Sequence, residues 1–425
     1  MIIALMSLAM AESPMQIHTW TLDNKDTVIL VEDHRVPVAL VNTRFPIGDL
    51  TPWFKDNHGD EAFQILYYDA EQSIAQRTNT LAASLSASCG DYACKSVITL
   101  LKSDLDAGLE LYKDMLGNTN IDTDELGRWK KGQKIDWESQ LKEPDFIGYQ
   151  ALLAELYPDP TDARRIAYEK PDDINEDSAT LNASAAHILQ TPGRIIGFAG
   201  DITKAEAEAI VKDLLPESKA PEAESLPNMT APKTIADGRV KEHSTTMSDL
   251  TQVYFYYYRD GLSLDDPNYP AYRLANHVLG GHFYSRLYTA LRHDDGDTYG
   301  VSAGTQIYPK DPGAYVIDTF TRTDNRDTVK EKLMGVLKDY SENGMTEEEL
   351  QEAKSNLAGR RKRDMQSPMS VLGDLASNQV LGLPLDFDDT IIENALALDL
   401  ESVNAFIRDF YNPEQFTMLT VESEK

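Results

Sequence analysis

The sequence predicts an α+β protein built from two tandem domains of one fold, each with a mixed, largely antiparallel sheet packed with helices. The main indication is a repeated series, because each half of the chain runs through a strand, a helix, a hairpin, further helices and a final strand. A second indication is the proline-rich polar segment at 216–238, which is typical of a linker. We therefore expect domains at 16–215 and 239–425, after an N-terminal extension at 1–15.

The first half contains the whole series. Apolar residues recur at helical spacing in 103–116 behind a serine N-cap, and Thr203-Lys-Ala-Glu206 has the pattern of a capping box. The expected elements, in order, are two strands within 27–45, helical structure to about 81, a cysteine hairpin, helices at 103–116 and 122–141, a strand at 194–200 and a helix at 207–215.

The second half repeats this order. It opens with a tyrosine-rich strand, and a second capping box, Thr346-Glu-Glu-Glu349, begins one of its helices. The expected elements are a strand at 252–258, a helix at 272–292, a hairpin of 299–306 and 314–321, a helix at 326–340, further helices and a strand at 416–421.

Charge and the N-terminus restrict the classes of function. The chain has 70 acidic and 40 basic residues, a formal charge of -30, which argues against nucleic-acid or anionic-membrane binding. Residues 1–11 are apolar, too short to span a bilayer, and end in a small-x-small site, so they match a secretory signal without its basic start. We expect an exported, periplasmic protein; a buried strand in a cytoplasmic protein is the alternative.

The two cysteines, Cys89 and Cys94, flank a Gly-Asp turn between two strand-like runs. Their sulfur atoms would face each other across a hairpin, which favours a disulfide and an oxidising compartment. A metal pair is the alternative, although no second Cys or His pair lies nearby to complete a tetrahedral site.

The turn between Arg292 and Tyr299 is the main candidate site. An arginine at a helix end and a tyrosine at the start of the next strand can point to the same side of the connection. They would offer a cation and a phenolic donor to one oxygen, as in an oxyanion site. Alternatively, the arginine caps helix carbonyls and the tyrosine packs.

Segment 279–288, Leu-Gly-Gly-His-Phe-Tyr-Ser-Arg-Leu-Tyr, leads into this turn, and Gly200-Asp-Ile-Thr203 closes the first half. With the two tandem halves, these motifs resemble the pitrilysin/insulinase superfamily of zinc peptidases over about 27–421. The resemblance implies half of a clam-shell of α/β-roll domains, and it implies that Arg292 and Tyr299 hold the scissile carbonyl. The residues that we expect to contact substrate are Gly280, Gly281, His282, Phe283 and His293.

The zinc motif of that family is incomplete here. Active members use His-x-x-Glu-His and a downstream glutamate. In one register His58 and Glu61 remain and Ala62 replaces the second histidine; in the other, aligned on Gly59, no ligand remains. The downstream acids are Asp136 and Glu138. Such a set binds zinc too weakly for a catalytic site, so we expect no metal or other cofactor in this chain.

The resemblance and this departure together imply a zinc-less subunit of a two-chain peptidase. A homologous partner with the intact motif would supply zinc and the general base, and the substrate would be a peptide or an unfolded polypeptide. Two alternatives remain: a binding or assembly subunit without turnover, and an independent peptidase with a variant metal site.

Overall fold

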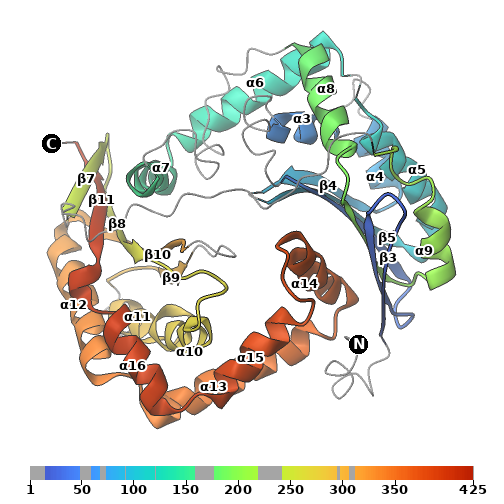
Figure 1. Ribbon diagram of the computed structural model, residues 1–425. Coiled ribbons are helices and arrows are strands. Elements are labelled where there is room, and N and C mark those ends of the chain that lie inside the picture. Colours follow the sequence, from blue (N-terminus) through green and yellow to red (C-terminus); the bar gives the residue numbers. More distant parts are fainter. Residues whose placement is uncertain are drawn as a thin grey trace. The chain divides into compact units, whose positions relative to one another are not determined.

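The computed structural model of the chain describes residues 15–47, 59–67, 73–90, 92–119, 121–157, 177–218, 242–293, 297–305 and 312–424. These residues form two compact units, each built round one sheet (Figure 1). Both sheets are mixed and packed with helices, which confirms the predicted α+β class. The expected N-terminal extension lies outside the described residues apart from Met15, and so does most of the expected linker.

The first unit contains a six-stranded sheet of order β1-β2-β6-β3-β5-β4. Strands β2 and β6 pair in parallel and the other neighbours are antiparallel. The strands are β1 Gln16–Thr21, β2 Thr27–Glu32, β3 Val38–Pro46, β4 Ser84–Cys89, β5 Ala93–Leu101 and β6 Ile195–Gly200.

Both faces of this sheet are buried. Val28 and Leu30 of β2 belong to one hydrophobic core, whereas Ile29 and Val31 belong to a core on the opposite face. Full burial of each such side chain is worth about 1.5–3 kcal/mol. The first core includes side chains of α3 Gly59–Ile65, α4 Ser73–Thr80, α5 Leu105–Leu116, α6 Thr123–Gln140, α8 Ser178–Leu189 and α9 Lys204–Ile210.

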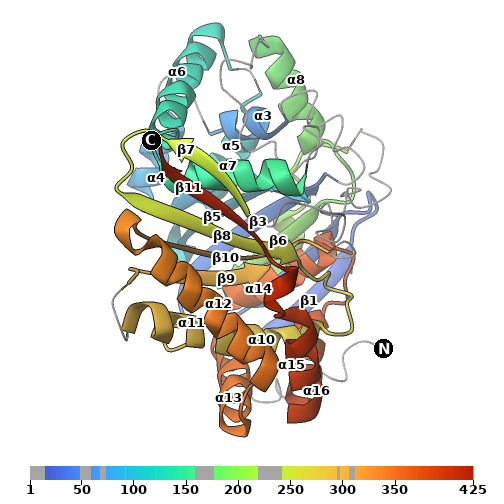
Figure 2. The same ribbon diagram turned by 90° about the vertical axis from the view of Figure 1, so that its left-hand side faces the viewer.

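The second unit contains a five-stranded sheet of order β7-β11-β8-β10-β9, whose strands lie side by side in Figure 2. On one face, Tyr315 packs edge-on against rings from two helices, Tyr272 at 6.2 Å and Phe410 at 5.4 Å between ring centroids. The elements are β7 Glu242–Met247, β8 Gln252–Asp260, β9 Val301–Thr305, β10 Ala314–Arg322, β11 Thr417–Ser423, α10 Tyr269–Gly280, α11 Arg286–Tyr288, α12 Arg326–Asn343, α13 Glu347–Asp364, α15 Phe387–Ala397 and α16 Leu400–Phe410.

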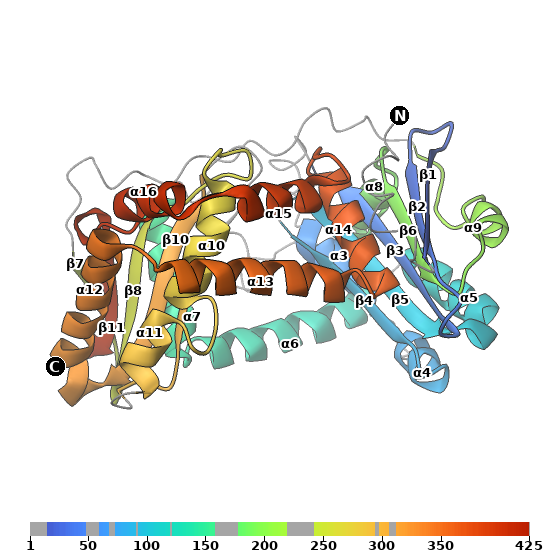
Figure 3. The same ribbon diagram turned by 90° about the horizontal axis from the view of Figure 1, so that it is seen from below.

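Each half of the chain contributes one helix to the other sheet. Helix α7, Pro144–Leu156, packs on the second sheet, where a Cβ on Gly148 would lie 2.3 Å from Tyr256. Helix α14, Pro368–Val380, packs on the first sheet beside β3 and β6 (Figure 3), and a Cβ on Gly197 would lie 2.8 Å from Leu372. Glycine therefore permits the close approach at both contacts.

The compact units consequently combine distant segments. The described residues of the first fall within Met1–Trp137, Glu169–Asn228 and Lys362–Phe387; the rest of the described chain belongs to the second. Among the described residues, no helix combines the length and apolarity needed to cross a bilayer.

Candidate functional site

The expected single helix at 272–292 is wrong, because α10 ends at Gly280. A Cβ on Gly280 would lie 2.4 Å from the Cβ of Ala303 in β9, and one on Gly281 would lie 2.7 Å from the Cα of His277. Larger residues would therefore push the helix end away from the sheet. The chain then turns and resumes as α11, followed by a π-helical turn at Thr289–His293. Both glycines thus shape the segment that carries Arg292.

Arg286 fixes α11 to the neighbouring helices. Its guanidinium donates two hydrogen bonds of 2.8 Å to the carboxylate of Glu349 and one of 2.9 Å to the carbonyl of Gly344. The same guanidinium lies 4.8 Å from the ring centre of Tyr340. Two parallel hydrogen bonds between arginine and carboxylate define orientation as well as position. The Ser-Arg-Leu motif therefore anchors the segment that precedes Arg292.

Arg292 lies among three aromatic rings. Its guanidinium carbon is 4.9 Å from the ring centre of Phe283, 5.4 Å from that of Tyr288 and 4.7 Å from that of Tyr299. Its Nη1 donates a 2.9 Å hydrogen bond to the Tyr288 hydroxyl. These contacts restrict the rotamers of a long side chain and hold its charge in one place. Tyr288 is absent from the predicted site residues, although its spacing of four residues from Arg292 puts both on one helical face.

Tyr299 projects from the turn with 75% of its surface exposed, and Phe283 is 45% exposed. An exposed phenol next to a half-buried guanidinium can donate to the same ligand oxygen. The structure therefore brings together three of the predicted site residues, Arg292, Tyr299 and Phe283, while their roles stay predictions.

A threonine cluster holds the backbone on both sides of Tyr299. The Thr298 hydroxyl donates to the carbonyl of Phe320 at 2.5 Å, and the Thr319 hydroxyl donates to the carbonyl of Gly300 at 2.8 Å. Asp297 accepts hydrogen bonds from Lys332 and Asn325, and the Lys332 bond is the main cause that lowers the pKa of Asp297. The turn is thus fixed to β10 and α12 although Tyr299 itself is exposed.

His282 and His293, the two histidines predicted to contact substrate, differ in their surroundings. The rings of His277 and His282 stack with centroids 4.4 Å apart, and the backbone N–H of Tyr284 donates to Nδ1 of His282 at 3.2 Å. Burial, the neighbouring His282 and Arg360 lower the pKa of His277 to about 4, and burial lowers that of His282. Both rings are therefore neutral at pH 7. His293 ends the π-helical turn, and its side chain lies outside the described part of the chain.

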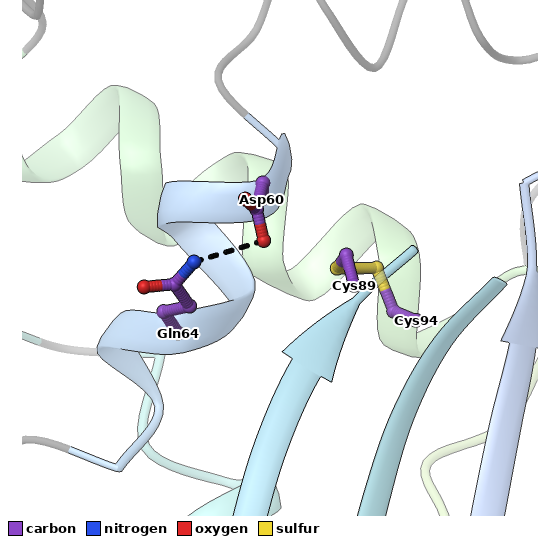
Figure 4. The surroundings of a disulfide bond; sticks show 4 residues. All are labelled: Asp60, Gln64, Cys89 and Cys94. Carbon is purple, nitrogen blue, oxygen red and sulfur yellow. Dashed lines mark hydrogen bonds between the residues drawn. A yellow bond between two sulfur atoms is a disulfide. The ribbon is translucent and has the colours of Figure 1, made fainter. Parts of the chain in front are cut away.

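The region that would hold zinc has a different character. Ala62 on α3 is 1% exposed and belongs to the hydrophobic core. Two residues before Ala62, Asp60 accepts a 3.0 Å hydrogen bond from Gln64, and burial raises the pKa of its carboxyl (Figure 4). His58 lies outside the described residues, whereas Asp136 and Glu138 lie on the exposed surface of α6.

Where the chain is described, no three His, Cys, Asp or Glu side chains come together as a possible metal site. An apolar, fully buried Ala62 offers no lone pair to a metal, and Asp60 is engaged by Gln64. The described residues of this region therefore do not fit a zinc ion, which needs at least three protein ligands in a catalytic site.

A disulfide joins Cys89 and Cys94 next to α3 (Figure 4). The two residues face each other in the antiparallel pairing of β4 and β5. A backbone hydrogen bond from Cys89 to Asp60 links this hairpin to the helix. The redox state of the cysteines in the native protein stays a prediction.

Comparison with known proteins identifies similar chains. Residues 195–357 match the family model of the peptidase M16 inactive domain. The "Non-peptidase homolog YmxG" of Helicobacter pylori is 30% identical over 151 residues, which are 35% of this chain and 34% of that protein. The "Uncharacterized zinc protease YmxG" of Bacillus subtilis is 23% identical over 330 residues, 76% of this chain and 77% of that one.

Among solved structures, a peptidase M16 inactive domain from Pseudomonas fluorescens superposes with a TM-score of 0.82 at 22% identity. The superposition covers 96% of this chain and 99% of that one. This similarity establishes the fold over nearly the whole chain.

Proposed function

We propose that the chain is the zinc-less subunit of a two-chain metallopeptidase of the M16, or pitrilysin, type. Residues 195–357 match the inactive-domain model of that family, and the similar chains and the shared fold support the proposal. The observation that carries this proposal is the pairing of Arg292, fixed by three rings, with the exposed Tyr299. The substrate is a peptide or an unfolded polypeptide.

In this role the two side chains bind the carbonyl oxygen of the peptide bond that is cleaved. Negative charge develops on that oxygen as the bond is attacked, and donors that are already in position stabilise it without reorganisation. Arg292 supplies a permanent positive charge and Tyr299 an O–H donor. Tyr288 and Phe283 limit the motion of the guanidinium, so its orientation is set before substrate binds.

The partner is a homologous subunit with an intact His-x-x-Glu-His motif. The chemistry of α3 supports this assignment, because Ala62 is buried and apolar where a ligand would be needed. The partner therefore supplies the metal and the base, and this chain supplies carbonyl binding. No step of the reaction passes through a metal held by this chain.

We further propose that the protein is exported to the periplasm. The apolar start of the sequence at 1–11 favours secretion, and the Cys89–Cys94 bridge is favoured in an oxidising compartment. Fractionation of cells tests the export, and thiol labelling of the recovered protein tests the bridge. Recovery in the cytoplasmic fraction would reject export, and free thiols in the exported protein would reject the disulfide.

Reconstitution tests the function itself. Turnover of an unfolded peptide mixture is measured for this chain, for the zinc-bearing chain and for the two together. We expect turnover only for the pair. If the pair associates but is no more active than the zinc-bearing chain alone, this chain is a binding or assembly subunit instead.

A further inference from the structure

The second sheet carries a cavity for which neither the family match nor the resemblance assigns a function. It has a volume of about 400 Å³, within the range of about 300–1,000 Å³ usual for ligand sites. Helix α7 packs against β7, β11 and β8, and the cavity lies beyond it, over β10 and β9. Its lining residues are Asp145, Tyr149, Tyr256, Ser302, Gly304, Thr305, Val316 and Asp318.

The strand register explains how the floor of the cavity forms. Asp318 pairs with Tyr256 on one side and with Ser302 on the other, so the three side chains form a row on one face of the sheet. Val316 and Gly304 form the next row. A Cβ on Gly304 would meet no atom within 4 Å, so this position opens into free space.

Two carboxyl groups from different elements face this cavity, Asp145 at the start of α7 and Asp318 on β10. Burial raises the pKa of each, and the charge of Asp145 raises that of Asp318 further. Among the described residues that line the cavity there is no lysine or arginine. Two carboxylates that are partly removed from water without a cation are stabilised by a bound positive charge.

A second cavity leads from this one towards the Arg292 site. A neighbouring cavity of about 220 Å³ shares Asp145, Tyr256, Ser302 and Asp318 and extends to Tyr288 and Gly300. Tyr288 accepts the hydrogen bond from Arg292, and Gly300 directly follows Tyr299. A peptide held at Arg292 and Tyr299 can therefore place a nearby side chain between the two carboxylates.

We infer that the Asp145–Asp318 cavity is a specificity subsite for a basic side chain, preferably arginine, of the bound peptide. The guanidinium group suits it because its five N–H donors can reach both carboxylates and the hydroxyls beside them. The surplus of acidic residues attracts such peptides from a distance. The inference rests on the proposed function, because it assumes that a peptide occupies the Arg292 site.

Binding of two matched peptides tests the inference. The peptides are identical except that one carries a single arginine and the other citrulline, which has the same shape without the charge. Affinity for the full-length chain is measured by fluorescence anisotropy. We expect about a tenfold preference for arginine, the usual size of a hydrogen-bonded charge interaction. Asp145→Asn and Asp318→Asn should each reduce this preference, and the double variant should abolish it.

Two further variants control for indirect effects. Asp106→Asn removes an exposed acid of α5 in the first unit and should leave the preference unchanged. Gly304→Val adds a side chain at the floor of the cavity, keeps both aspartates in the sequence and should also remove the preference. Thermal unfolding verifies that each variant is folded.

The results separate the two proposals. Equal affinity for both peptides, binding of neither, or a preference that survives in the double variant overturns the subsite. The proposed function is tested independently by turnover of the reconstituted pair on a substrate without basic residues. Such turnover combined with equal peptide affinities would reject the subsite alone.

Discussion

The α3 region of the first unit and the Arg292 region of the second differ in what they leave exposed. Ala62 and Phe63 are at most 1% exposed, and the helix is tied to the disulfide hairpin through Asp60. In the second region Tyr284 and Tyr299 are 76% and 75% exposed, and hydrogen bonds of Thr298 and Thr319 hold the backbone on both sides of Tyr299. The first region has become core, whereas the second keeps large side chains available to a ligand.

This difference indicates where function remains. Exposed aromatic groups gain little for folding, so a rigid turn that presents them is better explained by binding than by packing. The buried helix, in contrast, gains stability from every apolar side chain that replaces a polar one. The following predictions test whether the contrast is one of function, starting with the largest expected effect.

Replacement of the pair itself should have the largest effect. Tyr299→Phe in the reconstituted pair should lower turnover by about a hundredfold to a thousandfold, on the order of 3–4 kcal/mol, because one donor to the developing oxyanion is lost. Arg292→Lys should also lower turnover, since an ammonium on a flexible side chain cannot replace the planar guanidinium group.

Tyr284→Phe removes a hydroxyl from another exposed tyrosine and is the matched control. Subunit association is followed by sedimentation. Full activity of the Tyr299→Phe pair would mean that the tyrosine only packs, and the contrast between the two regions would then have no functional basis.

Tyr288→Phe should reduce turnover by about tenfold to a hundredfold, because Arg292 loses a hydrogen bond worth about 1.5–3 kcal/mol. A double-mutant cycle defines the mechanism. If Tyr288 acts only by orienting Arg292, its replacement should cost nothing further in the Arg292→Lys background. An equal loss in both backgrounds would contradict this positioning role.

The prediction of the second site from sequence was partial for a physical reason. Arg292, Tyr299 and Phe283 are close along the chain, and a turn confines such residues to a small volume. The contact of Tyr288 with Arg292 follows from their spacing of four residues, whereas the close approach of Gly280 to Ala303 joins two different elements. Local pattern does not contain that approach.

Two other features could not be predicted from the sequence for the same reason: the packing of α7 and α14 on the sheet of the other half, and the acidic cavity. Helix α7 is not among the elements expected from the sequence, and nothing in its residues specifies which sheet it covers. Asp145 and Asp318 are 173 positions apart in the sequence, and only the register of β8, β10 and β9 with α7 brings them to one cavity. Periodicity predicts elements, whereas tertiary packing decides which distant residues meet.

Asp60→Asn should have a smaller effect, on the order of 1 kcal/mol, and in the stabilising direction at neutral pH. Burial raises the pKa of Asp60, so the folded state binds a proton more readily than the unfolded chain. The free energy of unfolding therefore falls as pH rises above the ordinary value of 3.8, and asparagine avoids this loss.

Urea denaturation at neutral pH and below pH 3.8 measures the effect. The advantage of Asp60→Asn should disappear in acid, where the carboxyl is protonated in both states. The control Asp106→Asn should show no such dependence on pH. If Asp60→Asn lowers the free energy of unfolding at neutral pH, the charged carboxylate of Asp60 stabilises the fold and the prediction is wrong.

The last prediction concerns zinc content, for which we expect the smallest effect. The native chain should bind no stoichiometric zinc. Equilibrium dialysis followed by metal analysis should find far less than one zinc per chain. Ala62→His would recreate the His-x-x-Glu-His pattern from His58 onwards, yet we expect no gain in zinc. The new ring would enter a position that is 1% exposed within the core, and a downstream third ligand is still required. Tight zinc in the native chain would show that the first region has kept a metal site. If only the folded Ala62→His variant binds zinc, the native chain lacks zinc because one histidine is missing, and not because the helix is buried.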